Sequence, residues 1–177
     1  HTEECRQRGY PFVADPSQQL ARMSGEEVRT LIDGAAFLIT NDYEKELLES
    51  KTGLSDAEVL ARVGIRVTTL GKDGVRISGR DSGTGEPFAP IEVPVAQEIR
   101  AYDPTGVGDG FRSGFFAALS WGLPLERSAQ VGALLATLVL ETVGTQEYEV
   151  RADLFARRLA ESYGAAAAEE IRPFLAD

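Results

Sequence analysis

The stretch Asp103-Pro-Thr-Gly-Val-Gly-Asp-Gly110 decides the fold, and it runs directly into an apolar segment that begins at Phe111. Its internal glycines leave the backbone uncovered, so that successive N–H groups can point at one anion. A helix that begins behind them adds the positive end of its dipole and further free donors. The stretch therefore predicts an anion site at a helix N-terminus.

Asp109 stands in the same turn, where its negative charge would repel an anion. This placement makes sense if Asp109 receives the proton of a hydroxyl group that attacks a phosphoryl group. The alternative is that Asp109 only caps the helix and the glycines form a tight turn, which fits the isolated peptide at least as well. The stretch is not a Walker P-loop, because Gly-Lys-Ser/Thr is absent. It also lacks the dinucleotide fingerprint, because Phe111 stands where the third glycine belongs.

The composition excludes several other kinds of chemistry. The 177 residues include one histidine, His1, and one cysteine, Cys5. A Ser-His-Asp triad and a His-ligated metal are nearly excluded, and a disulfide framework or a cysteine-cluster metal site is excluded. An enzyme of this composition would have to work with carboxylates, backbone amides and a hard cation.

Charge and length limit the class of protein. The 28 acidic and 18 basic side chains give a net charge of -10, which argues against nucleic acid or an anionic membrane as a partner. The length suits one domain of about 100–200 residues. The longest apolar run, Val131–Leu140, is too short to span a membrane. We expect a cytoplasmic protein with no nucleic-acid or membrane partner.

Strand and helix signals alternate along the chain. Short apolar runs bounded by turn residues predict strands, and capped amphipathic runs predict helices. This alternation predicts an α/β fold, a doubly wound and mainly parallel sheet with helices on both faces. The predicted strands are 10–14, 35–40 and 65–70, with short antiparallel segments between 71 and 98, and residues 15–19 are predicted as a polar loop. The predicted helices are 2–8, 24–32, 41–52, 55–63, 111–121, 124–141, 153–162 and 167–175.

Three further motifs accompany the first. Asn41-Asp-Tyr-Glu44 follows one predicted strand, Thr68-Thr-Leu-Gly-Lys-Asp-Gly74 ends another, and Val143-Gly-Thr-Gln146 follows the second long helix. With Asp103–Asp109, they resemble in type and order the signatures of the ribokinase-like (PfkB) family of sugar and nucleoside kinases. Within that family the resemblance is closest to bacterial adenosine kinases. One reason is that Asp15-Pro-Ser-Gln-Gln19 stands where many sugar kinases carry Asp-x-Asn-x-Arg.

The resemblance implies a role for each matching residue. Asp109 would be the general base, and the amides of Gly106, Val107 and Gly108 would stabilise charge on the transferring phosphoryl group. The implied cofactors are ATP and Mg²⁺, and the resemblance leaves open whether K⁺ also binds. The resemblance also places Asn41 and Glu44 at magnesium, Glu44 acting through water, and Thr69, Gly71 and Gly74 at the nucleotide. It places Gln18 and Gln19 at the acceptor, and Asp103 and Thr105 at a monovalent cation.

Most of these residues also have a purely structural explanation. A capping box explains Asn41 and Glu44, a strand end and its turn explain Thr69 and Gly71, a solvated loop explains Gln18 and Gln19, and a turn without an ion explains Asp103 and Thr105. Phe115, Phe116, Trp121, Leu134 and Leu138 follow helical spacing and are predicted to be core residues, and not a surface that stacks on a base.

The resemblance implies an ATP-dependent kinase that phosphorylates the 5′-hydroxyl of a nucleoside, with adenosine as the first candidate and AMP and ADP as products. A sugar or another nucleoside is the alternative acceptor, and a chain that binds nucleotide without catalysis is the alternative from another class. We expect residues 1–177 to be the C-terminal nucleotide-binding and catalytic portion of a ribokinase-like domain, without its N-terminal part and lid. A homodimer stays open as a partner.

Overall fold

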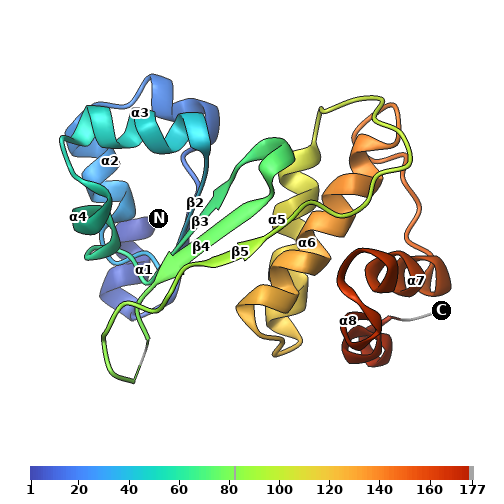
Figure 1. Cartoon of the computed structure of the whole chain (residues 1–177). Coiled ribbons are helices and arrows are strands. Elements are labelled where there is room, and N and C mark those ends of the chain that lie inside the picture. The colour runs from blue at the N-terminus through green and yellow to red at the C-terminus, as the bar shows by residue number, and fades with distance from the viewer. Residues whose placement is uncertain (82, 176–177) are drawn as a thin grey trace. The chain divides into compact units, whose positions relative to one another are not determined.

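The computed structural model (Figure 1) describes residues 1–81 and 83–175, which divide into two units. The first unit contains His1–Gly71 and Arg76–Glu92. The second contains Lys72–Val75 and the chain from Val93 onward. Each unit has a hydrophobic core of its own.

A sheet with the strand order β1-β2-β3-β4-β5 lies mainly in the first unit. β1 pairs with β2, and β2 with β3, in parallel register, with Phe37 opposite both Val13 and Ile65. This confirms the predicted parallel sheet. The strands are β1 (Val13–Ala14), β2 (Phe37–Asn41), β3 (Ile65–Thr69), β4 (Val75–Gly79) and β5 (Ile91–Val93).

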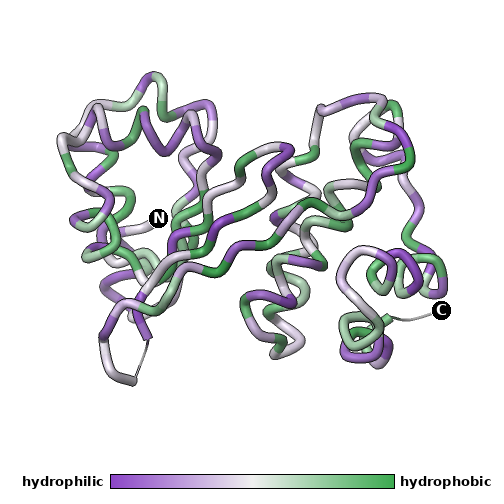
Figure 2. Tube along the Cα trace, viewed as in Figure 1, coloured by the Kyte–Doolittle hydropathy of each residue, from purple (hydrophilic) through white to green (hydrophobic). Residues whose placement is uncertain are grey.

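Three helices of the first unit begin with the capping boxes that the sequence predicts. Each pairs a Ser or Asn with a Glu three residues later, so two free N–H groups are satisfied at each helix start. The helices mix hydrophilic and hydrophobic positions (Figure 2) and bury their apolar faces with Leu38 of β2. The helices are α1 (Thr2–Arg8), α2 (Gly25–Ile32), α3 (Asp42–Thr52) and α4 (Asp56–Leu60), with short 3₁₀ helices η1 (Ser17–Ala21) and η2 (Gly71–Asp73).

The second unit is helical. Its two long helices lie side by side (Figure 1), and they approach closely where glycines face each other: a Cβ on Gly132 would stand 2.7 Å from the carbonyl oxygen of Phe111. Leu134, Leu138 and Phe115 are buried, as predicted for core residues. The helices are α5 (Val107–Ser120), α6 (Leu125–Leu140), α7 (Ala152–Tyr163) and α8 (Ala165–Ile171), followed by the 3₁₀ helix η3 (Arg172–Phe174).

Several predicted boundaries are wrong, each for a local reason. β1 is limited to two residues, in part because Pro11 has no N–H to offer a ladder. Residues 17–21 form a 3₁₀ helix instead of a loop. α8 stops before Pro173 and gives way to η3. The helix predicted from Phe111 begins at Val107, because Gly106 adopts φ +81° and becomes its N-cap.

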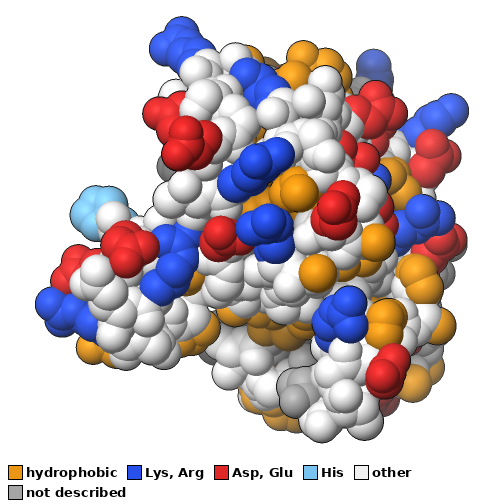
Figure 3. Space-filling view, turned by 90° about the vertical axis from the view of Figure 1, so that its left-hand side faces the viewer, with side chains coloured by type: hydrophobic (Ala, Val, Ile, Leu, Met, Phe, Trp, Pro, Cys, Tyr) orange, Lys and Arg blue, Asp and Glu red, His pale blue; other side chains and the backbone are white. Residues whose placement is uncertain are grey.

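Charged side chains of both signs lie on the surface, and the helices are short, as the sequence predicts. On the face shown in Figure 3, acidic and basic side chains are interspersed. Among the described residues, no helix combines the length and the apolar character that crossing a membrane requires.

Candidate active site

The N-terminus of α5 presents backbone amides, as the glycine pattern predicts. Gly110 N–H donates to the carbonyl oxygen of Gly106 at 2.8 Å and closes the first helical turn. Within the described residues, the amides of Gly106, Gly108 and Asp109 have no internal acceptor. The Val107 amide differs from the prediction, because it donates to the carbonyl oxygen of Pro104 at 3.3 Å. In the described part of the chain, the amides of Gly106, Gly108 and Asp109 are therefore the ones left for the predicted anion site, and Val107 is committed to the turn.

Asp109 lies in the first turn of α5 and projects into solvent, with its side chain 88% exposed. The nearest cation is the Arg112 guanidinium, 4.0 Å from the carboxylate oxygen Oδ1. In the described part of the chain, no side-chain cap bond joins Asp109 to Gly106, which a capping box would require. The carboxylate is thus accessible to a ligand hydroxyl and lies in the same turn as the unpaired amides.

Asp103 organises the loop that leads into α5. Its Oδ1 accepts the amide of Thr105 at 2.9 Å, and its Oδ2 lies 3.5 Å from the amide of Gly144. The Thr105 side chain and amide, with a smaller contribution from Gly144, hold the pKa of Asp103 below its usual range. These partners are all hydrogen-bond donors and suit a turn, and the monovalent cation predicted at Asp103 and Thr105 stays a prediction.

The loop also packs on the segment that follows α6. A Cβ placed on Gly106 would stand 3.0 Å from Cγ2 of Thr145. Glycine at position 106 is therefore required twice, by its positive φ and by this close approach. The motif Val143–Gln146 gives no role to Thr145 by itself. In the structure, Thr145 packs against Gly106 at the start of α5.

A second group of predicted residues meets in the first unit. Asn41 ends β2, Thr69 ends β3, and the parallel register sets them opposite each other. Asn41 Oδ1 accepts the amide of Glu44 at 2.7 Å, and Glu44 Oε2 accepts the amide of Asn41 at 2.8 Å. This capping box leaves Oε1 of Glu44 outside the pair, at the carboxyl end of parallel strands where α/β proteins bind ligands. The group fits a hydrated magnesium ion, which needs oxygen acceptors for its waters.

The two glycines predicted at the nucleotide differ in their surroundings. Gly71 adopts φ +58° at the start of η2, and nothing stands within 4 Å of where its Cβ would be. Gly74 adopts φ +89°, and a Cβ there would stand 2.1 Å from the carbonyl oxygen of Val93. Packing alone therefore explains Gly74, whereas Gly71 is open to a ligand.

Gln18 and Gln19 are exposed on η1, in the first unit. Lys51 of α3 fixes the end of this short helix by donating to the carbonyl oxygens of Ala21 (3.1 Å) and Met23 (2.7 Å). The two glutamines thus project from an anchored 3₁₀ turn, and their proposed contact with an acceptor stays a prediction.

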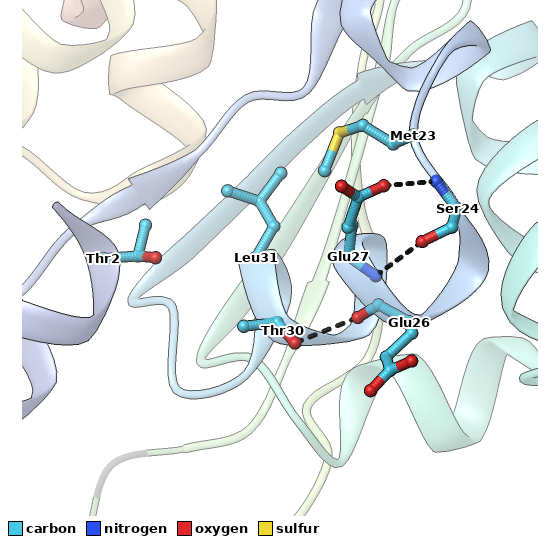
Figure 4. Close-up of a pocket in the computed structure, with 7 residues that line it drawn as sticks. All are labelled: Thr2, Met23, Ser24, Glu26, Glu27, Thr30 and Leu31. Atoms are coloured by element: carbon cyan, nitrogen blue, oxygen red, sulfur yellow. Dashed lines mark hydrogen bonds between the residues drawn. The ribbon is translucent and has the colours of Figure 1, made fainter.

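A shallow surface pocket of about 710 Å³ lies on the first unit (Figure 4). Three of its polar side chains are engaged at α2: Ser24 and Glu27 form the capping box, and the Thr30 hydroxyl donates to the carbonyl oxygen of Glu26 at 3.0 Å. The pocket contains none of the predicted site residues. The residues predicted for the site lie elsewhere, at the ends of β2 and β3 in the first unit and at the N-terminus of α5 in the second.

The profile of the pfkB carbohydrate kinase family matches residues 2–151. The chain belongs to this family. This pfkB family member is 33% identical to a nucleoside kinase of Methanocaldococcus jannaschii over 132 residues, which cover 75% of this chain and 41% of that one. It is 30% identical to a Bacillus subtilis ribokinase over 142 residues, which cover 80% of this chain and 44% of that one.

Solved structures confirm the ribokinase-like fold. The structure of a Burkholderia thailandensis nucleoside kinase in complex with inosine is similar at 32% identity and a TM-score of 0.85, covering 93% of this chain and 53% of that one. The ADP-inosine complex of the same kinase gives 32% identity and a TM-score of 0.85, covering 93% and 49%. The pfkB family member thus spans about half the length of the relatives that it matches.

Proposed function

We propose that the full-length protein is an ATP-dependent kinase that phosphorylates the 5′-hydroxyl of a purine nucleoside. The observation that supports it most is the first turn of α5, where the exposed carboxylate of Asp109 lies beside the amides of Gly106 and Gly108, which have no acceptor among the described residues. Donors for a phosphoryl group and an acceptor for a proton are both needed for phosphoryl transfer to an alcohol.

In the proposed reaction, Asp109 takes the proton of the acceptor hydroxyl while the oxygen of that hydroxyl bonds to the γ-phosphorus of ATP. The bond from that phosphorus to the oxygen bridging it to the β-phosphate breaks, and ADP leaves. The amides of Gly106 and Gly108, with the positive end of the α5 dipole, stabilise the charge that develops on the transferring phosphoryl oxygens. Asp109 is the general base, and the amides are the transition-state donors.

Magnesium fits this proposal through the group at Asn41. Asn41 and Glu44 would hold the ion through its bound water, since the capping box leaves one Glu44 oxygen outside the pair. When bound, magnesium supplies neutralisation of the phosphate charge. Thr69, opposite Asn41 in the sheet, and Gly71 would contact the nucleotide.

Adenosine is our first choice of acceptor, with inosine next. The adenosine proposal rests on the likeness of Asp15–Arg22 to bacterial adenosine kinases, with Gln18 and Gln19 contacting the nucleoside. The inosine complexes of the Burkholderia kinase favour a purine nucleoside more broadly. ADP release measured with adenosine, inosine, a pyrimidine nucleoside and ribose decides among them. Ribose as the best acceptor would contradict the proposal.

Replacing the general base tests the mechanism. Asp109→Asn in the full-length protein should lower kcat by about 10²–10⁴-fold, with ADP affinity nearly unchanged. Asp153→Asn is the matched control, because Asp153 also lies in the first turn of a helix of the second unit. Normal turnover in Asp109→Asn would refute the assigned base. Binding of ATP without binding or phosphorylation of any acceptor would favour a protein that binds nucleotide without catalysis.

A further inference from the structure

A nearly buried ion pair joins Glu141 to Arg158, and Arg158 lies beyond residues 2–151, the part of the chain that the family profile covers. Arg158 of α7 and Glu141, the residue after α6, have side chains only 7% and 12% exposed. Arg158 donates from Nη1 to Glu141 Oε2 at 2.5 Å and from Nη2 to Oε1 at 2.7 Å. This two-bond arrangement fixes the orientation of both side chains and not only their separation.

Both partners also hold the chain segment that leads to the anion loop. Glu141 Oε1 accepts the amide of Ile99 at 2.6 Å, and Arg158 Nη2 donates to the carbonyl oxygen of Gln97 at 2.8 Å. Next to them, the carbonyl oxygen of Leu140 accepts the amides of Tyr102 (2.8 Å) and Asp103 (3.2 Å). These bonds hold residues 97–103 to the end of α6, up to and including Asp103, the first residue of the loop.

Glu141 is also close in sequence to the segment on which the loop packs. Glu141 is three residues before Gly144, whose amide faces Asp103, and four before Thr145, which stands against Gly106. A shift of Glu141 would therefore move both residues 97–103, which lead into the loop, and the segment on which the loop packs.

We propose that the Arg158–Glu141 pair is a positioning device that aligns the Asp103–Asp109 loop for phosphoryl transfer. The proposal rests on the function proposed above, because it assigns the purpose of the alignment. Neither side chain is placed at the substrate. They act through the backbone they hold, and misplacing catalytic groups by about 1 Å can cost about 10²-fold in rate.

The second unit provides a more exposed arginine–glutamate pair as a control. Arg127 of α6 and Glu170 of α8 also form a two-bond pair, at 3.0 and 3.1 Å. Neither residue of this pair hydrogen-bonds to residues 97–103 or to the anion loop in the described part of the chain. Any general effect of losing an arginine–glutamate pair in this unit should appear in both sites, whereas a positioning effect should appear only at Arg158.

Two variants separate positioning from stability. Arg158→Met leaves the Glu141 carboxylate without its arginine, so both Tm and kcat should fall. The double variant Arg158→Met/Glu141→Leu removes both charges, and replacing a buried pair with apolar side chains commonly restores stability. We expect the double variant to regain most of its Tm while its kcat with ATP and the preferred nucleoside stays about 10–100-fold below that of the wild type. Arg158→Lys, which keeps the charge without the fork, should recover kcat only in part.

Hydrogen exchange gives a readout that does not require activity. The amides of Ile99, Tyr102 and Asp103 should exchange faster in the double variant than in the wild type, and should be unchanged in Arg127→Met. Wild-type kcat in a folded double variant, or unchanged exchange at these amides, would overturn the positioning proposal. If the wild-type protein phosphorylates no acceptor, the proposed function fails, and faster exchange at these amides would still support the pair as the fastening of the loop.

Discussion

Gly106 shows how much of the site depends on one residue. It adopts φ +81°, which costs other L-residues about 1–2 kcal/mol, and Thr145 stands against the position of its Cβ. Gly106→Ala should therefore lower the free energy of unfolding by more than the conformational cost alone, and it should turn the free Gly106 amide away from the phosphoryl group. Urea unfolding and kcat measured on the same preparation check both effects.

Gly122 provides the control for Gly106→Ala. It has the same φ of +81° at the end of α5, and nothing stands within 4 Å of its Cβ position. Gly122→Ala should cost only the conformational term and leave kcat at the wild-type value. Equal losses of stability in the two variants would show that the contact with Thr145 adds nothing to the cost of a Cβ at position 106.

The capping boxes permit a similar separation at the level of the element. α2 and α3 begin with the same device, Ser24 with Glu27 and Asn41 with Glu44. Ser24→Ala and Asn41→Ala should each destabilise by about 1 kcal/mol through the lost cap. Only Asn41→Ala should also raise the magnesium concentration needed for half-maximal turnover, because only Asn41 lies at the proposed metal group. A magnesium titration that is the same in both variants would leave Asn41 as a cap alone.

Helices with their own chemical signals were the most predictable elements. Ser24, Asn41 and Ser55 each sit three residues before a glutamate, and all three helices begin there. Sequence propensity misplaces the start of α5, because glycines argue against a helix interior, whereas Gly106 caps this helix through its φ of +81°. η1 was missed because 3₁₀ turns depend on tertiary anchoring, here by Lys51, more than on local propensity.

The sequence predicts candidate site residues where a residue type carries chemistry, as for Asp109, Asn41 and Glu44, and their roles stay predictions. The site was not predictable where the backbone does the work: nothing in the sequence says that Val107 N–H is committed to Pro104. Arg158 did leave a signal, since it is a charged residue beside Phe155 and Leu159 on the buried face of α7. Such a residue needs a buried partner, but no local rule identifies Glu141 as that partner.

At the scale of the whole molecule, the chain has two cores that share no residue. One gathers around β2 and α2–α4 and includes Leu38, and the other gathers around α6–α8 and includes Leu134. The predicted site residues fall on both sides of this division, with Asn41 in the first unit and Asp109 in the second. Under the proposed function, turnover would need both units to be folded, although each buries its own apolar surface.

Two matched cavity variants test how far the cores are independent. Leu38→Ala and Leu134→Ala each remove a fully buried leucine, so each should cost about 2–5 kcal/mol in its own unit. Because each leucine packs within one core, hydrogen exchange should accelerate chiefly at the amides of β2 and β3 in the first variant, and at those of α6 and α7 in the second. Both variants should lose turnover in proportion to the fraction of molecules with either unit open. Equal acceleration in both units for either variant would mean that the two cores unfold as one cooperative body, and that the division of the site between them has no energetic counterpart.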